Sequence, residues 1–299
     1  MKEELFVGCG TALITPFKNN KVDYYALEKL LVRQIEANVK AIIVLGTTGE
    51  PCTLCSGERE NIIKFCRQVI PKGIKMIVGT GGNNTTEVIK KSKQAQSLGA
   101  DGLLVVTPYY NKCTDNGLYL HYQKIANAVT LPIIIYNVPG RTGVNITPEM
   151  ALKLSTVKNI VGIKEASGNI SQANKLFSLL KDKMAIYCGE DELNYTFLCL
   201  GASGLISVLS NIVPKETQKL CDYVLGGKYK KGLEINNKYY SLSKKLFLET
   251  NPIPVKAASS MLNLCNNELR LPLCKMGYEN SLILKEELKT LGLIKNDCM

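Results

Sequence analysis

The sequence predicts an α/β fold, a (β/α)8 TIM barrel with extra C-terminal helices, and three observations support this prediction. Eight short apolar runs recur along the chain, and their starts are spaced by 20 to 34 residues, the size of one strand–helix repeat. The segments between the runs have helical periodicity. The chain has 299 residues, and barrels of this class commonly use about 250 residues as one unit.

The eight runs are predicted to be parallel strands covered on both faces, because most of them are continuously apolar rather than alternating. They are CGTALITPF at 9–17, AIIVLG at 41–46, KMIVGTG at 75–81, GLLVVTP at 102–108, LPIIIYNVP at 131–139, NIVGIKEAS at 159–167, MAIYCGE at 184–190 and GLISVLS at 204–210. No change in composition interrupts this series, which favours one closed barrel over a doubly wound sheet.

Amphipathic helices are predicted between the strands. Residues 147–149, Thr-Pro-Glu, are typical of a helix start, with a capping hydroxyl, a first-turn proline and an early acid. Apolar side chains fall at helical spacing in two earlier segments, at Leu27, Leu30, Leu31 and Ile35 and at Ile62, Ile63, Cys66 and Ile70. Residues 230–247 and 277–293 are predicted to be further helices. We therefore expect a barrel at 1–224 and a C-terminal helical extension at 225–299.

Composition narrows the class of protein. No apolar run reaches the ~18 residues that cross a bilayer, and the start MKEELFVGCG lacks the apolar core of a signal peptide. We therefore expect a cytoplasmic protein without a membrane partner. The net charge is +11, but the lysines are scattered and no nucleic-acid motif occurs. This pattern predicts a solvated basic surface that weakly steers anionic substrates, and no nucleic-acid partner.

The cysteines and the histidine do not form a recognisable metal site. The chain has eleven cysteines, of which only Cys52 and Cys55 form a C-x-x-C pair, and its single histidine, His121, lies in a helical pattern. No zinc-type ligand set is complete. We expect no metal, reduced thiols that pack as small apolar groups, and His121 as a helix-surface or packing residue.

The candidate active site lies where the strands end, because barrels of this class place their chemistry at the carboxyl ends of the strands. The second run leads into GTTG at 46–49, whose hydroxyl and N–H groups can converge on a carboxylate, although an ordinary turn explains it equally well. Tyr109, Tyr110 and Tyr136 follow or end strands, and such tyrosines either carry protons or simply pack. Arg141 follows a Pro-Gly turn and offers a fork-shaped donor to a carboxylate. A surface salt bridge is the alternative.

Lys164 lies in the sixth run, where an unpaired ammonium group would be costly. It and Tyr136 come five or six residues into consecutive strands, so their side chains should lie side by side, ~4.8 Å apart along the sheet. Burial disfavours the ammonium form, and the free amine can condense with a ketone. The carbon next to the resulting iminium then loses a proton and attacks an aldehyde. Pairing with Glu165 is the alternative, but neighbouring strand residues point to opposite faces.

These residues resemble the dihydrodipicolinate synthase family, in order and with matching spacing, over essentially the whole chain. The motifs are GTTGE at 46–50, YYN at 109–111, YNVPGRT at 136–142 and GIKEAS at 162–167. The resemblance implies a class I aldolase-type enzyme of lysine and diaminopimelate biosynthesis. Such an enzyme condenses pyruvate with aspartate semialdehyde without a cofactor or a metal.

The resemblance also implies a role for each site residue. Lys164 would form the Schiff base, and the proton relay would consist of Tyr136, Thr47 and Tyr110, the last reaching in from a neighbouring subunit. The substrate-binding residues would be Thr47 and Thr48 for the carboxylate of pyruvate, Arg141 for that of the semialdehyde, and Gly189 and Ile206, whose backbone lines the pyruvate pocket. This relay requires a homo-oligomer, and most family members are tetramers.

A regulatory site is implied in the same way. Five positions match the site where feedback-inhibited members bind lysine: Ser56, Arg59, Asn83, Glu87 and Tyr109. The lysine-sensitive bacterial type has histidines at the positions of Ser56 and Arg59. Arg59 would bring a like charge near a cationic ligand, at a cost of about 1 kcal/mol or more. We therefore expect weak or absent inhibition by lysine.

Other functions stay open on the sequence. A related Schiff-base pyruvate aldolase or lyase acting on a keto-sugar acid shares the lysine and the first tyrosine, but such enzymes usually lack an arginine in the turn of Arg141. A catalytically inactive barrel that acts as a sensor or a nucleic-acid-binding scaffold is a third possibility, and the complete set of lysine, tyrosine and threonine argues against it. One histidine is too few for a metal-dependent aldolase or hydrolase.

Overall fold

A computed structural model describes residues 3–295, and the predicted (β/α)8 barrel is confirmed. The barrel strands are β1 (Gly8–Ala12), β4 (Ala41–Val44), β5 (Lys75–Gly79), β6 (Gly102–Val106), β7 (Ile133–Asn137), β8 (Ile160–Glu165), β9 (Ala185–Cys188) and β10 (Gly204–Ser207). Each lies within or overlaps one of the eight predicted runs. They pair in parallel in the order β1-β10-β9-β8-β7-β6-β5-β4, and β1 closes onto β4.

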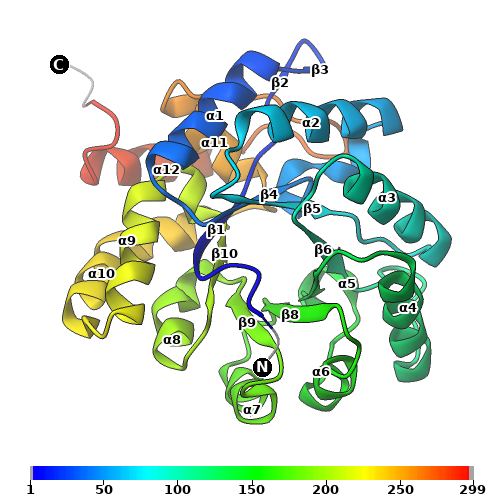
Figure 1. The fold of residues 1–299 in the computed structure, drawn as a ribbon. Coiled ribbons are helices and arrows are strands. Elements are labelled where there is room, and N and C mark those ends of the chain that lie inside the picture. The colour runs from blue at the N-terminus through cyan, green and yellow to red at the C-terminus, as the bar shows by residue number, and fades with distance from the viewer. Residues whose placement is uncertain (1–2, 296–299) are drawn as a thin grey trace.

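Helices surround the strands (Figure 1). They are α1 (Tyr24–Glu36), α2 (Ser56–Val69), α3 (Thr85–Ser97), α4 (Asp115–Ala128), α5 (Pro139–Thr142), α6 (Pro148–Leu154), α7 (Ile170–Leu180), α8 (Asn194–Cys199) and α9 (Pro214–Leu225). Short 3-10 turns follow three of the strands, η1 (Thr47–Gly49) with η2 (Pro51–Thr53), η3 (Asp191–Leu193) and η4 (Leu209–Asn211). The helix start predicted at Thr147 is confirmed, because its hydroxyl accepts a hydrogen bond from the backbone N of Met150 (3.2 Å).

The first predicted strand is too long. β1 ends at Ala12, and the chain turns into a small antiparallel hairpin of β2 (Phe17–Lys18) and β3 (Lys21–Val22). Pro16 has no backbone N–H to donate to a sheet ladder, so the apolar run around it could not continue a central strand.

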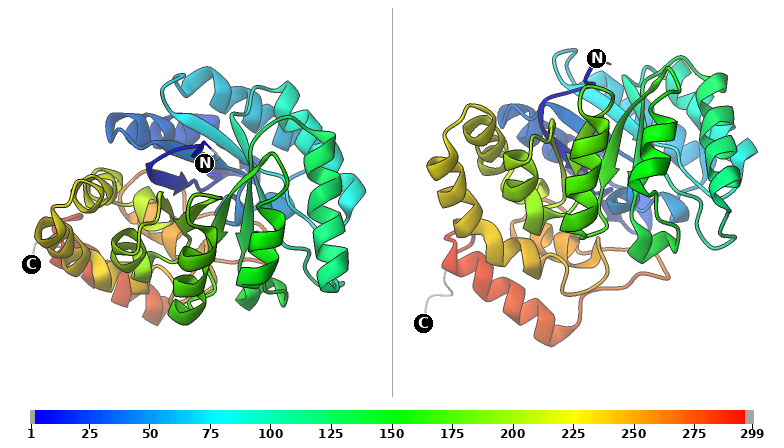
Figure 2. Two further views of the ribbon diagram at one scale, coloured as in Figure 1. Left: turned by 60° about the horizontal axis from the view of Figure 1, so that its bottom comes forward. Right: turned by 90° about the horizontal axis from the view of Figure 1, so that it is seen from below.

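Three helices form the C-terminal extension: α10 (Tyr229–Lys245), α11 (Ile253–Met261) and α12 (Tyr278–Thr290). The first and last correspond to the two predicted helices, whereas α11 was not predicted. In Figure 2 the orange and red segments that end the chain gather at the end of the barrel opposite the N-terminus. Helices α11 and α12 therefore lie near the carboxyl ends of the strands, whereas α10 packs beside α9. The division of the chain at residue 224 stays a prediction.

The core fills the barrel and the space between strands and helices. All residues of β4 and β7 are buried, as expected for strands covered on both faces. His121 on α4 is also buried, with Nδ1 2.9 Å from the hydroxyl of Thr85 on α3, and burial lowers its pKa to about 4. Among residues 3–295, no helix has the length and apolar character needed to cross a membrane.

The ten cysteines of the described residues are free thiols. Cys9, Cys66, Cys188 and Cys221 are buried, and burial raises the pKa of Cys9 and of Cys66 to about 12. These four pack as the predicted small apolar groups. Packing does not account for the exposed ones, which are Cys52, Cys55, Cys199 and Cys274.

Candidate active site

Lys164 and Tyr136 are neighbours at the carboxyl end of the barrel. Tyr136 on β7 is the register partner of Lys164 on β8, so the predicted register is confirmed. Both side chains are buried, and Lys164 Nζ lies 4.3 Å from the centre of the tyrosine ring. The ring face carries partial negative charge that attracts a cation. The sheet therefore places a nucleophilic amine and a phenol in contact inside the barrel.

Glu165 points away from Lys164, as the alternation of strand side chains requires. Its carboxylate accepts hydrogen bonds from the backbone N of Ser167 (2.8 Å) and from the side-chain amide of Asn137 (2.9 Å), its own register partner on β7. The side-chain amide of Gln172 on α7 adds a third bond at 3.3 Å. These partners lie between the barrel and its helices, so the carboxylate of Glu165 is satisfied there, away from Lys164.

The GTTG segment forms the 3-10 turn η1 directly after β4. Thr48 is buried, and its hydroxyl oxygen accepts a hydrogen bond from Nδ2 of Asn251 (2.9 Å). Thr47, one residue earlier, lines a cavity of about 330 Å³ together with Tyr136 and Arg141. Thr47 thus lies in the same cavity as the tyrosine, while the hydroxyl of Thr48 is bonded to Asn251.

Arg141 lies on α5, the single turn of helix that follows β7. Its side chain is exposed to the cavity, and Nη2 donates to the backbone oxygen of Asn251 (3.0 Å). Asn251 therefore contacts both the turn after β4 and the arginine after β7. Asn251 was not predicted from the sequence, because it lies in a loop of the C-terminal extension and no strand or motif precedes it.

The segment after β9 is packed tightly against Lys164. A Cβ atom on Gly189 would lie 2.6 Å from Cε of Lys164, so any larger residue would displace the lysine. Ile206 on β10 is one residue beyond Leu205, which pairs with Cys188, the residue before Gly189. The two predicted backbone positions therefore lie at the same level on adjacent strands.

Glu190 is a second residue that the sequence analysis missed. Burial raises its pKa to about 7, with further increases from the charges of Asp191 and Glu192, while Lys164 and Arg141 act in the opposite direction. A carboxyl group that titrates near neutral pH beside these cations can hold or release a proton. The signal was present in the sequence, because Glu190 is the acid that ends the seventh run, directly after Gly189.

Tyr110 is not brought into the site of its own chain. It follows β6, its side chain is 92% exposed, and its backbone has a positive φ of 70°, a conformation that is costly for a residue with a large side chain. Its neighbour Tyr109 instead lines the cavity together with Arg59. The chain therefore presents one tyrosine inward and the next one outward at the same loop.

The five predicted regulatory positions lie around the outer part of this region. Arg59 is buried on α2 and donates to the backbone oxygens of Pro51 (3.3 Å) and Gly79 (3.1 Å). Ser56 begins α2, Glu87 lies in the first turn of α3, and both are exposed. The backbone oxygen of Asn83 accepts from Asn111 (3.0 Å). The residues share one neighbourhood, and Arg59 is held by backbone oxygens.

Nowhere in residues 3–295 do three or more His, Cys, Asp or Glu side chains gather as a metal-binding group.

Comparison with known proteins agrees over almost the whole chain. The model of the dihydrodipicolinate synthetase family matches residues 5–291. A 4-hydroxy-tetrahydrodipicolinate synthase of Clostridium perfringens (strain SM101 / Type A) is 47% identical over 291 residues, 97% of this chain and 100% of that protein.

Solved structures agree as well. The crystal structure of dihydrodipicolinate synthase from Thermotoga maritima is 45% identical with a TM-score of 0.96, covering 97% of this chain and 100% of that one. The chloride-inhibited dihydrodipicolinate synthase from Acinetobacter baumannii complexed with pyruvate is 43% identical with a TM-score of 0.95 at the same coverage. This chain belongs to the dihydrodipicolinate synthetase family.

Proposed function

We propose that this protein condenses pyruvate with (S)-aspartate-4-semialdehyde through a lysine Schiff base, as a step of diaminopimelate and lysine biosynthesis. The observation that carries the proposal is the contact between Lys164 and Tyr136, with Nζ 4.3 Å from the ring centre at the carboxyl end of the barrel. Relatives named for this activity, and one solved with pyruvate, support the choice of substrates.

Lys164 is the nucleophile in this proposal. Its amine attacks the ketone carbon of pyruvate and water leaves, which gives an iminium that draws electrons from the adjacent methyl carbon. That carbon loses a proton and attacks the aldehyde of the second substrate. Tyr136 and Thr47 carry protons between these groups and solvent, together with the partner subunit's Tyr110.

The two carboxylates of the substrates are bound by two groups of residues that Asn251 links. The hydroxyls and N–H groups of Thr47 and Thr48 receive the carboxylate of pyruvate, and the fork of Arg141 receives that of the semialdehyde. Gly189 and Ile206 supply backbone and leave the space that the lysine adduct needs. Asn251, which contacts Thr48 and Arg141, keeps the two binding groups in a fixed relation.

The proposal includes a homo-oligomer, most simply a tetramer, in a cytoplasmic setting. Tyr110 supports the oligomer, because a strained and 92% exposed tyrosine next to the site gains a partner only if another subunit covers it. We also propose weak or absent inhibition by lysine. If lysine binds at the five positions Ser56, Arg59, Asn83, Glu87 and Tyr109, the buried guanidinium group of Arg59 opposes this cationic ligand.

The substrate assignment is tested by a direct comparison of reactions. The purified protein should consume aspartate semialdehyde only when pyruvate is present, and should not release pyruvate from sialic acid or from keto-deoxygluconate. Cleavage of either sugar acid at a rate above that of the condensation would contradict the assignment and favour a retro-aldolase.

A further inference from the structure

Two residues from distant parts of the chain form an ion pair in the interior. Glu50 directly follows the turn η1, Lys256 lies on α11, and their side chains are 1% and 0% exposed. Lys256 Nζ also donates to the backbone oxygen of Glu268 (2.8 Å) and lies 4.0 Å from the centre of the Phe17 ring. The ion pair thus joins the C-terminal extension to the segment that carries Thr47 and Thr48.

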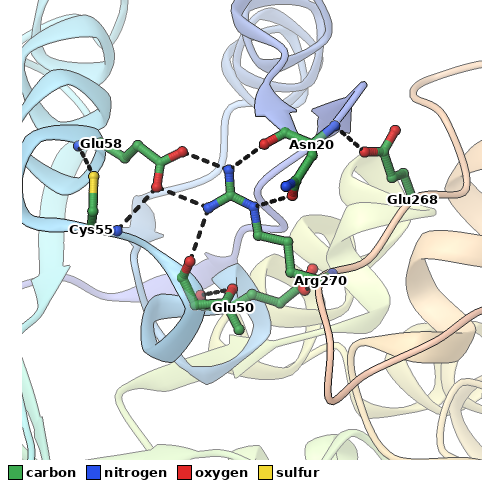
Figure 3. A network of polar contacts seen from close by, with 7 residues as sticks. Asn20, Glu50, Cys55, Glu58, Glu268 and Arg270 are labelled. Atoms are coloured by element: carbon green, nitrogen blue, oxygen red, sulfur yellow. Dashed lines mark hydrogen bonds and ion pairs between the residues drawn. The ribbon is translucent and has the colours of Figure 1, made fainter.

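Arg270, in the segment after α11, contacts Glu50 and the neighbouring helix α2 (Figure 3). Its backbone N donates to the carboxylate of Glu50 (3.2 Å), and its guanidinium group binds both carboxylate oxygens of Glu58 on α2 (2.6 and 2.8 Å). The same group donates to the backbone oxygen of Asn20 (2.6 Å). Glu50 therefore receives contacts from two separate parts of the extension.

The turn that these contacts hold is strained at both ends. Leu45 before it and Glu50 after it have positive φ values of 58° and 51°. Such backbone conformations are costly for residues other than glycine, and they persist only where the surroundings enforce them. Thr47 and Thr48 lie between the two strained residues. Without contacts from other segments, the turn would relax and the hydroxyl groups of Thr47 and Thr48 would move.

Stability alone does not explain a buried ion pair at this position. Removing two charges from water costs several kcal/mol per ion, and apolar residues of similar size often stabilise a protein as well or better. An ion pair does fix orientation, which apolar packing does less strictly. Asn251, five residues before Lys256 in the sequence, contacts both Thr48 and Arg141. The position of α11 therefore affects the positions of both of these residues.

We propose that Glu50 and Lys256 are positioning residues whose ion pair seats α11 against the turn. They thereby set the placement of the groups that bind the two substrate carboxylates, Thr47 with Thr48 on one side and Arg141 on the other. This inference rests on the proposed function and adds a role for the C-terminal extension as a working part of the active site. Neither residue contacts a reacting atom.

The test compares stability with substrate affinity in one double variant. Glu50→Gln/Lys256→Met removes both charges, so its free energy of unfolding should stay near that of the wild type. Lys256→Met alone should be strongly destabilised, because it leaves Glu50 unpaired. In the double variant, the pyruvate concentration that half-saturates borohydride trapping on Lys164 should rise about tenfold or more, and KM for the semialdehyde should rise with it. These factors correspond to the loss of one hydrogen bond to a charged group.

A second ion pair of the extension is the matched control. Lys245 on α10 and Glu287 on α12 lie 2.5 Å apart and are partly buried. Lys245→Met/Glu287→Gln removes both charges in the same way and should change neither substrate constant. If the Glu50/Lys256 variant does not fold, Arg270→Met removes the side-chain contacts with Glu58 and Asn20 that hold the neighbouring segment and leaves the ion pair in place, and a smaller rise in both constants is expected.

The possible results distinguish the positioning role of the ion pair from the proposed function of the protein. Wild-type substrate constants in the folded Glu50/Lys256 and Arg270 variants would overturn the positioning role, while wild-type trapping on Lys164 would leave the proposed function intact. An equal rise in the substrate constants of the control pair would also overturn it, since the effect would then not be specific to the Glu50–Lys256 pair. Failure of the wild-type protein to trap pyruvate on Lys164 would contradict the proposed function itself.

Discussion

Lys164 and Tyr136 are register partners on adjacent parallel strands, and the nitrogen of the lysine lies 4.3 Å from the centre of the tyrosine ring. This relationship is fixed by the sheet, because the backbone hydrogen bonds of β7 and β8 determine which residues lie side by side. The reactive pair therefore does not depend on a flexible loop.

Tyr136→Phe should preserve the fold and remove most of the turnover. The ring keeps its packing against Lys164, but the hydroxyl that carries protons is lost, which typically costs 10²- to 10⁴-fold in rate. Steady-state condensation rates and thermal unfolding of the two proteins are the measurements. Near-normal turnover of a folded variant would remove Tyr136 from the relay.

Arg141→Ala should weaken the use of the semialdehyde far more than the reaction with pyruvate. A lost bond between a guanidinium and a carboxylate costs about 1.5 to 3 kcal/mol, so KM for the semialdehyde should rise by roughly 10- to 100-fold. Arg141→Lys is the control, since it keeps the charge and loses the fork. An equal loss in Schiff-base formation and in semialdehyde use would count against this role.

Glu190 should make stability depend on pH near neutrality. Its pKa is raised to about 7, first by burial and then by Asp191 and Glu192, whereas an unfolded glutamate titrates near ~4.3. Below both values the group is protonated in either state. As the pH rises towards 7 the unfolded state ionises first, so folding becomes less favourable, and the loss levels off above pH 7.

Glu190→Gln removes this titration and should therefore gain stability relative to the wild type as the pH rises. The difference in the free energy of unfolding should grow by about 1 to 3 kcal/mol between pH 5 and pH 8. Urea unfolding of both proteins at several pH values measures it. A difference that is constant across this range would show that Glu190 does not titrate there.

Tyr110 is expected to act in the site of another subunit, and mixed oligomers test this. Tyr110→Phe and Lys164→Met proteins should each be nearly inactive. When the two chains are co-expressed and assemble at random, a site formed by Lys164 of one chain and the partner subunit's Tyr110 is intact in about a quarter of cases. Recovery of activity to this level supports the shared site, and no recovery in verified mixed oligomers would place Tyr110 outside it.

The strands and the reactive pair could be predicted from the sequence, because they depend on local patterns. Parallel strands buried on both faces appear as continuous apolar runs, and the two-residue period of strands relates Tyr136 to Lys164 once the runs are aligned. Lys164 was also conspicuous as a charge within such a run. These features need no knowledge of the rest of the chain.

Contacts between distant segments could not be predicted in this way. Helix α11 is buried over most of its length from Ile253 to Ser259, so it has no polar face and no amphipathic period to reveal it. The contacts of Asn251 with Thr48 and of Lys256 with Glu50 join residues more than 200 positions apart. Only the closure of the barrel and the return of the extension bring them together.

The central claim is that Lys164 forms a covalent intermediate with pyruvate, and borohydride reduction in the presence of pyruvate tests it most directly. The treated wild-type protein should carry one pyruvate-derived adduct per chain, on the peptide that contains Lys164, and a folded Lys164→Met variant should carry none. Mass spectrometry of the intact chain and of its peptides gives the answer. Labelling at another lysine, or no labelling of the wild type, would contradict the mechanism.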